Sequence, residues 1–191
     1  VSAGKYIATA NSSTQASCPQ GTYKGSHTVT YGNTSSCSSC PTNYDDGAGA
    51  TSQAGCKWTV PGGKYIASAN ATSATSCAAG KYKASHTVSY GGTSSCSSCV
   101  AGTYSLAGAS SCTNCSAGTY SVTGGTACFN CEAGYYCPAA SARQTCPSGY
   151  TSDAKATAQS NCYISVAGGK YLGTANSSTT SSCAAGKYKA A

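Results

Sequence analysis

The stretch CSSCVAGTYSLAGASSCTNCSAGTYSVTGGTACFNC (residues 96–131) contains three Cys-x-x-Cys pairs separated by two similar segments. This spacing is compatible with a zinc site, a redox motif or a ladder of disulfides. The choice decides the fold, because the chain has few residues for a packed core. Val, Ile, Leu and Phe number 13 of 191, whereas a globular chain needs roughly 20 %. Covalent bridges are therefore the expected source of stability.

The sequence argues against zinc and redox chemistry at these pairs. The four-cysteine pattern that ends at Cys131 begins at Cys112, but the same pattern also begins at Cys96, so one pair would have to serve two zinc sites. No helical pattern follows a pair, as a thioredoxin-type site requires. No pair is followed by His, as covalent haem requires. We expect no metal, no cofactor and no catalytic residue, and thus no enzyme.

A disulfide ladder predicts a definite connectivity. Within each Cys-x-x-Cys, the first cysteine closes one module and the second opens the next. Crossed bridges, Cys131–Cys146 with Cys137–Cys162, remain an alternative at one place. Cys183 stays unpaired, and we expect its partner to lie beyond a truncated end. The predicted pairs are Cys18–Cys37, Cys40–Cys56, Cys77–Cys96, Cys99–Cys112, Cys115–Cys128, Cys131–Cys137 and Cys146–Cys162.

The chain repeats itself internally. Residues 4–40 recur as residues 63–99, an offset of 59, and a third copy opens at GGKYLGTAN (168–176), offset by 106 from the second. The difference between the two offsets indicates that the second copy carries a 47-residue insertion of short cysteine modules. We expect a window from a longer repetitive protein, with linear stacking of its units. Its domains are predicted to be repeat 1 (1–59), repeat 2 (60–165, insertion about 99–145) and a truncated repeat 3 (166–191).

Nearly every module carries a tyrosine four or five residues after its opening cysteine, usually with Gly two positions earlier. A turn followed by a short strand fits this pattern. The predicted fold class is a small, disulfide-rich, all-β protein. We expect an elongated linear array of short hairpins with no helix of consequence. The tyrosines concerned are Tyr23, Tyr44, Tyr82, Tyr104, Tyr120, Tyr136, Tyr150 and Tyr188.

Residues 96–137 resemble the cysteine-rich repeat of ephrin-receptor-like and TNF-receptor-like extracellular proteins. The resemblance rests on Cys-x-x-Cys-x-Ala-Gly-Thr-Tyr-Ser followed by a further Cys-x-x-Cys. It implies disulfide-bonded modules at a cell surface and implies no single ligand. The GGKYIASAN segment (62–70) stands outside that family's pattern.

Charge and hydropathy limit the partners. The net charge of +7 is scattered, with no basic run, so we expect no nucleic-acid partner. No apolar stretch reaches the length of a membrane span. The cysteine density predicts an extracellular or secreted chain, at the cell surface.

Five Asn-x-Ser/Thr sequons make glycans possible partners. Three of them, Asn11, Asn70 and Asn176, are repeat-equivalent, and the others are Asn33 and Asn114. His27 and His86 are also repeat-equivalent, and we expect them to pack half-buried beside tyrosines.

Two functional hypotheses follow. In the first, the chain is a structural protein that associates with itself and forms or decorates a surface filament, because repeated contacts along a line produce open fibres. In the second, it is part of a receptor or adhesin ectodomain that binds another surface protein or a glycan.

Overall fold

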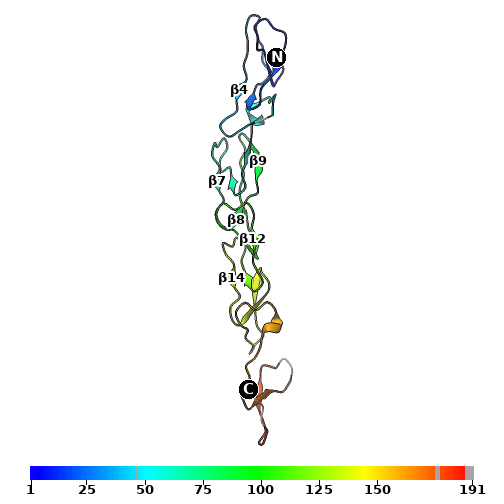
Figure 1. Cartoon of the computed structure of the whole chain (residues 1–191), viewed down its shortest axis with the longest axis vertical. Coiled ribbons are helices and arrows are strands. Elements are labelled where there is room, and N and C mark those ends of the chain that lie inside the picture. Colours follow the sequence, from blue (N-terminus) through cyan, green and yellow to red (C-terminus); the bar gives the residue numbers. More distant parts are fainter. Residues whose placement is uncertain (46, 175–176, 188–191) are drawn as a thin grey trace. The chain divides into compact units, whose positions relative to one another are not determined.

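The fold is built from two-stranded antiparallel hairpins joined by long loops, as the computed structural model in Figure 1 shows. The structure describes residues 1–45, 47–174 and 177–187. These residues contain no α-helix and two single 3-10 turns, η1 (Gln53–Gly55) and η2 (Gln159–Asn161). The predicted class, a small disulfide-rich all-β protein, is confirmed.

Within the described residues, eight hairpins follow one another in sequence. Most of their strands are only two residues long, which is short even for an edge strand. The paired strands are β1 (Lys5–Tyr6) with β2 (Ala16–Ser17), β3 (Thr22–Tyr23) with β4 (Ser38–Ser39), β6 (Lys64–Tyr65) with β7 (Thr75–Ser76), β8 (Lys81–Tyr82) with β10 (Ser97–Ser98), β11 (Thr103–Tyr104) with β12 (Thr113–Asn114), β13 (Thr119–Tyr120) with β14 (Phe129–Asn130), β15 (Tyr135–Ala139) with β16 (Ala142–Thr145), and β17 (Lys170–Leu172) with β18 (Thr180–Ser182).

Two compact units emerge from the contacts between residues. The first comprises Val1–Ala78, Tyr82–Ser97 and Ala107–Ser111, and the second comprises Ala79–Lys81, Ser98–Leu106 and Cys112–Ala191. The division between them falls inside the second sequence repeat.

A glycine two residues before a tyrosine opens each regular hairpin. In the GGKY segment, Gly63 has φ +80°, a conformation that side chains disfavour. Its carbonyl accepts a hydrogen bond of 2.8 Å from the Cys77 N–H after the second strand. The same bond joins seven further glycine–cysteine pairs: Gly4–Cys18, Gly21–Cys40, Gly80–Cys99, Gly102–Cys115, Gly118–Cys131, Gly134–Cys146 and Gly169–Cys183.

The GGKY segments therefore form the same hairpin as the cysteine modules, although the sequence pattern separates them. In the GGKY segment of repeat 2, the hairpin differs from the cysteine modules because no disulfide closes it. Val60 stands three residues before the turn glycine, where the other modules have the opening cysteine, and Ala74 precedes the second strand, where they have the closing one. Val60 and Ala74 belong to one apolar cluster. An apolar contact thus occupies the place of a disulfide.

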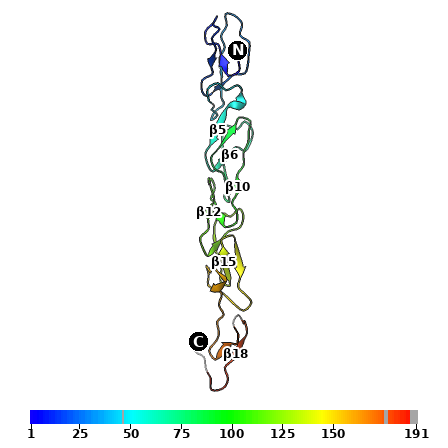
Figure 2. The ribbon, with the colours of Figure 1, turned by 90° about the vertical axis from the view of Figure 1, so that its right-hand side faces the viewer.

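This cluster is the main apolar core of the first unit. Val60, Ile66 and Val88 are buried, and Trp58, Ala71 and Ala74 pack against them. Burial of each of the larger side chains contributes about 1.5–3 kcal/mol. Val60 and Val88 of this cluster lie in the two strands of the remaining sheet, in which β5 (Lys57–Val60) pairs with β9 (His86–Ser89). Strand β5 leads directly into β6 (Figure 2).

The prediction that each of these tyrosines lies in a short strand is wrong in two modules. Tyr44 and Tyr150 lie outside strands, whereas the other described tyrosines of that set lie in them, and Tyr188 lies outside the described residues. In these two modules the turn residue, Asn43 or Gly149, directly precedes the tyrosine. One residue fewer therefore lies between the turn residue and the ring than in the other modules. Each hydroxyl donates 3.0 Å to a backbone carbonyl 27 residues further on.

Candidate functional site

The disulfide frame joins the cysteines in the order predicted from the sequence. The bridges span between 6 and 19 residues, with Cα–Cα distances of 5.6–6.0 Å. Cys131 bonds to Cys137 and Cys146 to Cys162, so the crossed alternative does not occur. Cys183 is a free thiol in the described part of the chain. The bridges are Cys18–Cys37, Cys40–Cys56, Cys77–Cys96, Cys99–Cys112, Cys115–Cys128, Cys131–Cys137 and Cys146–Cys162.

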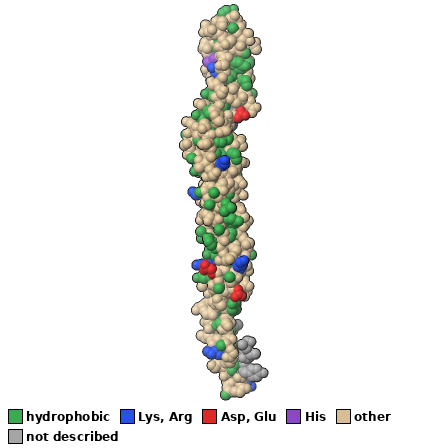
Figure 3. Space-filling view, turned by 60° about the vertical axis from the view of Figure 1, so that its left-hand side comes forward, with side chains coloured by type: hydrophobic (Ala, Val, Ile, Leu, Met, Phe, Trp, Pro, Cys, Tyr) green, Lys and Arg blue, Asp and Glu red, His purple; other side chains and the backbone are tan. Residues whose placement is uncertain are grey.

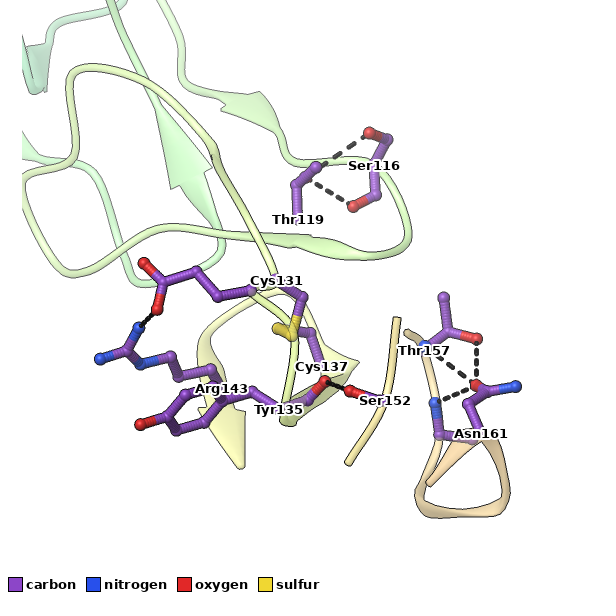
Figure 4. Close-up of a disulfide and its surroundings, with 11 residues drawn as sticks. Ser116, Thr119, Cys131, Tyr135, Cys137, Arg143, Ser152, Thr157 and Asn161 are labelled. Atoms are coloured by element: carbon purple, nitrogen blue, oxygen red, sulfur yellow. Dashed lines mark hydrogen bonds and ion pairs between the residues drawn. A yellow bond between two sulfur atoms is a disulfide. The ribbon is translucent and has the colours of Figure 1, made fainter. Parts of the chain in front are cut away.

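The bridge with the shortest loop lies in a polar surrounding, shown in Figure 4. The guanidinium of Arg143 pairs with the carboxylate of Glu132 and lies 4.4 Å from the centre of the Tyr135 ring. The Ser152 hydroxyl donates 2.6 Å to the Tyr135 carbonyl. The two Arg143 contacts lie within the module of the β15–β16 hairpin, and the Ser152 hydrogen bond ties this hairpin to the next module.

Buried serines form a recurring joint that the sequence analysis missed. Ser105, Ser121 and Ser152 are buried, and each hydroxyl donates to a carbonyl in the first strand of the preceding hairpin at 2.6–3.0 Å. In all three joints the serine carbonyl also accepts a hydrogen bond from the N–H of the turn glycine of that hairpin, at 2.9–3.1 Å. The sequence signal was the Ser that follows Gly-Thr-Tyr at positions 105 and 121.

A serine–histidine pair recurs in both repeats. The Ser94 hydroxyl lies 2.8 Å from His86 Nε2 and accepts a 2.9 Å hydrogen bond from the Ile66 N–H. His86 Nδ1 lies 3.1 Å from the Ala84 carbonyl. A neutral imidazole with its proton on Nδ1 satisfies all three contacts. The Ser94 hydroxyl therefore donates to the imidazole and accepts from the backbone, so the pair holds the loop between β9 and β10 against Ile66. Ser35, His27 and Ile7 repeat the arrangement.

An aromatic cluster covers the junction between repeats 1 and 2. The Tyr44 ring stands edge-on to the Trp58 ring at 5.7 Å and to the Tyr90 ring at 5.1 Å. Such pairs contribute about 0.5–1.5 kcal/mol beyond burial. Burial raises the pKa of the Tyr44 hydroxyl, and Tyr90 adds to the increase. The exposed Tyr163 has a raised pKa because its hydroxyl donates 2.9 Å to the Asp153 carboxylate.

The sequon side chains are accessible where the structure describes them. Asn11, Asn33, Asn70 and Asn114 are all exposed, and Asn11 and Asn70 adopt left-handed turns with φ of 63° and 61°. Asn176 lies outside the described residues. The exposed positions leave room for a glycan on each of the four asparagines.

No chemical centre assembles from the remaining polar residues that the structure describes. Within these residues, no group of three His, Cys, Asp or Glu side chains is arranged to hold a metal ion. No helix in the described ranges is both long and apolar enough to cross a membrane. Charged side chains are few on the face shown in Figure 3.

No protein-family model and no curated protein matches the chain. The seven disulfides indicate an extracellular or secreted protein, because such bridges persist in oxidising compartments.

Proposed function

We propose that the chain is a structural segment of an extracellular surface filament, which copies of the chain form or decorate. The observation that carries the proposal is the recurrence of one joint. The turn glycine of a hairpin donates its N–H to a carbonyl of the next module at Gly4, Gly63, Gly80, Gly102 and Gly134, at 2.7–3.1 Å. A joint that uses mainly the backbone is insensitive to side-chain identity. Further units of the same kind are therefore compatible with it.

The surface supports this proposal. Only 8 % of the residues are charged, so copies that meet side by side desolvate few ions. Several large apolar side chains remain exposed, among them Tyr31, Leu106, Val122 and Phe129. Aromatic side chains such as those of Tyr31 and Phe129 are enriched at protein interfaces.

Glycosylation is the second part of the proposal. Glycans on Asn11 and Asn70 would stand at the same place in two repeats, and a sugar coat would keep lateral association within limits. Mass spectrometry of native material before and after removal of N-glycans tests the four described asparagines. Peptides without a glycan at both Asn11 and Asn70 would refute the glycosylation part of the proposal.

Electron microscopy of the oxidised chain, together with sedimentation velocity over a hundredfold range of concentration, tests filament formation. We expect species that grow with concentration and appear as fibres. A monomer at every concentration would contradict the proposal and favour the receptor or adhesin hypothesis. A reduced and alkylated sample is the control, because it keeps the sequence and loses the disulfide frame.

A further inference from the structure

The disulfide ladder gives tension a shorter path along the chain than the backbone does. Where a bridge closes a loop, the tension passes through the S–S bond, and the residues inside the loop carry none of it. From Cys77 to Cys131 the bridges follow one another closely, because only two residues separate the end of one bridge from the start of the next. Covalent bonds therefore fix the length of this part of the chain.

One long stretch of the ladder lacks such a bypass. Cys56 ends one bridge and Cys77 begins the next, and the 20 residues between them, 57–76, contain no cysteine. Tension on the chain must pass through the backbone and the non-covalent contacts of this unbridged segment. The next longest unbridged stretch between the first and the last bridge is residues 138–145. Fully extended, the two stretches span about 70–75 Å and about 30 Å.

Non-covalent contacts alone hold the unbridged segment folded. Its β6–β7 hairpin is closed by the apolar cluster that contains Val60 and Ala74, where the other modules have a bridge. Its strand β5 pairs with β9 over four residues. The Gly63 N–H donates 2.7 Å to the Lys83 carbonyl. Each such contact contributes far less than a covalent bond, so the segment opens under a load that leaves the bridges intact.

The partners of the unbridged segment stay in place when it opens. On one side, Ser94 exchanges two hydrogen bonds of 2.9 Å with Ile66, and Ser94 lies inside the loop that the Cys77–Cys96 bridge closes. On the other side, the Tyr44 hydroxyl donates 3.0 Å to a carbonyl of the segment, and Tyr44 lies inside the loop of the Cys40–Cys56 bridge. Because neither loop carries tension, both keep the surfaces against which the segment refolds.

We propose that residues 57–76 are an extensible element, which opens under tension and lengthens the chain while the bridged modules keep their length. When the load falls, the segment refolds against its two neighbours. This inference deepens the proposed structural role and rests on it for the source of the tension, but the element itself is a property of the single chain. The apolar closure of this hairpin thereby lets the chain yield without the rupture of a covalent bond.

Force spectroscopy of single oxidised chains, held by tags at both termini, tests the element. We expect a reversible lengthening step that is shorter than about 70–75 Å by the folded distance between Cys56 and Cys77. Residues outside the first and the last bridge extend in every variant alike, so a comparison of variants isolates the step of the unbridged segment.

A new bridge should remove most of this step. Val60→Cys with Ala74→Cys places cysteines where the other modules have theirs. Once thiol titration shows that the bridge has closed, the step should shorten by about 40–45 Å, the length of the loop that the bridge encloses. Val60→Ser with Ala74→Ser is the matched control, which should keep the length of the step and lower the force at which it occurs.

Two insertions assign the step without a new bridge. Five Gly/Ser residues added after Ala67, in an exposed loop of the unbridged segment, should lengthen the step by about 17 Å. The same five residues added after Gly91, in an exposed turn inside the loop of the Cys77–Cys96 bridge, should leave the step unchanged, because the bridge carries the tension.

The outcomes separate this inference from the proposed function. A step that the closed bridge does not shorten, equal lengthening by both insertions, or a parent chain that does not refold after release overturns the extensible element, whether or not filaments form. A parent chain that yields and refolds as expected but sediments as a monomer at every concentration supports the element and contradicts the filament proposal alone.

Discussion

The turn glycine of the GGKY hairpin provides a sharp test of how the modules are held together. A Cβ built on Gly63 would stand 1.9 Å from the Gly108 carbonyl oxygen, where the backbones of two modules meet. Gly63 also has φ +80°. Replacement by alanine therefore carries two costs, one from the backbone conformation and one from the overlap with Gly108.

The two costs can be separated with a matched variant. Gly108→Ala has a similar φ of +74° but no atom within 4 Å of the new Cβ. It should cost about 1–2 kcal/mol of unfolding free energy, the penalty of a left-handed side chain. Gly63→Ala must also separate the two backbones, which strains the 2.8 Å bonds from Cys77 N–H to Gly63 and from Gly108 N–H to Cys77. At about 1 kcal/mol each, the total becomes about 3–4 kcal/mol.

The fluorescence of Trp58 reports the unfolding of this unit, because the single tryptophan packs against the cluster of Val60. Urea unfolding with intact disulfides, followed by tryptophan fluorescence, gives the free energies. Gly47→Ala, with no positive φ and no atom near its Cβ, should stay within about 0.5 kcal/mol of the parent. Equal losses in Gly63→Ala and Gly108→Ala would refute the close approach as a source of stability.

Three further predictions concern the core, the bridges and a buried hydroxyl. Ile66→Ala should cost about 2–5 kcal/mol in the same assay, whereas Leu106→Ala, 68 % exposed, should cost less than about 0.5 kcal/mol; equal losses would contradict the assigned core. Replacing both cysteines of the Cys77–Cys96 bridge, which spans 19 residues, should cost about 1 kcal/mol more in calorimetry than replacing those of Cys131–Cys137, which spans 6; the reverse order would exclude a loop-entropy origin. Because burial raises the folded pKa of Tyr44 above the unfolded value of 10.0, its contribution is complete below pH 10.0 and is lost as pH rises through the folded pKa; urea midpoints that decline equally in Tyr44→Phe would assign the decline to other groups.

The disulfide connectivity can be predicted well from the sequence, because it depends on the spacing of cysteines that are close together in the chain. In the Cys-x-x-Cys pairs, the cysteine that closes one module is separated by two residues from the cysteine that opens the next, which favours pairing between neighbours in the sequence. The all-β class follows from the same spacing, since loops this short leave room for turns and short strands. Tyr44 and Tyr150 show the limit of a pattern. One residue fewer lies between the turn residue and each ring, and the hydroxyl of each tyrosine donates to a carbonyl 27 residues further on, which the local pattern does not predict.

The sequence by itself determined the repeats and the shortage of residues for a large core, and it predicted the order of the bridges with one alternative left open, which the Cys131–Cys137 and Cys146–Cys162 bridges decide. Only the tertiary structure decided that the GGKY segments are hairpins of the same kind, because Val60 and Ala74 replace a disulfide through an apolar contact that no cysteine marks. It also decided why the turn residues are glycines, since Gly63 approaches a carbonyl 45 residues away in the sequence. Contacts over such separations depend on how successive modules stack, which local spacing does not encode.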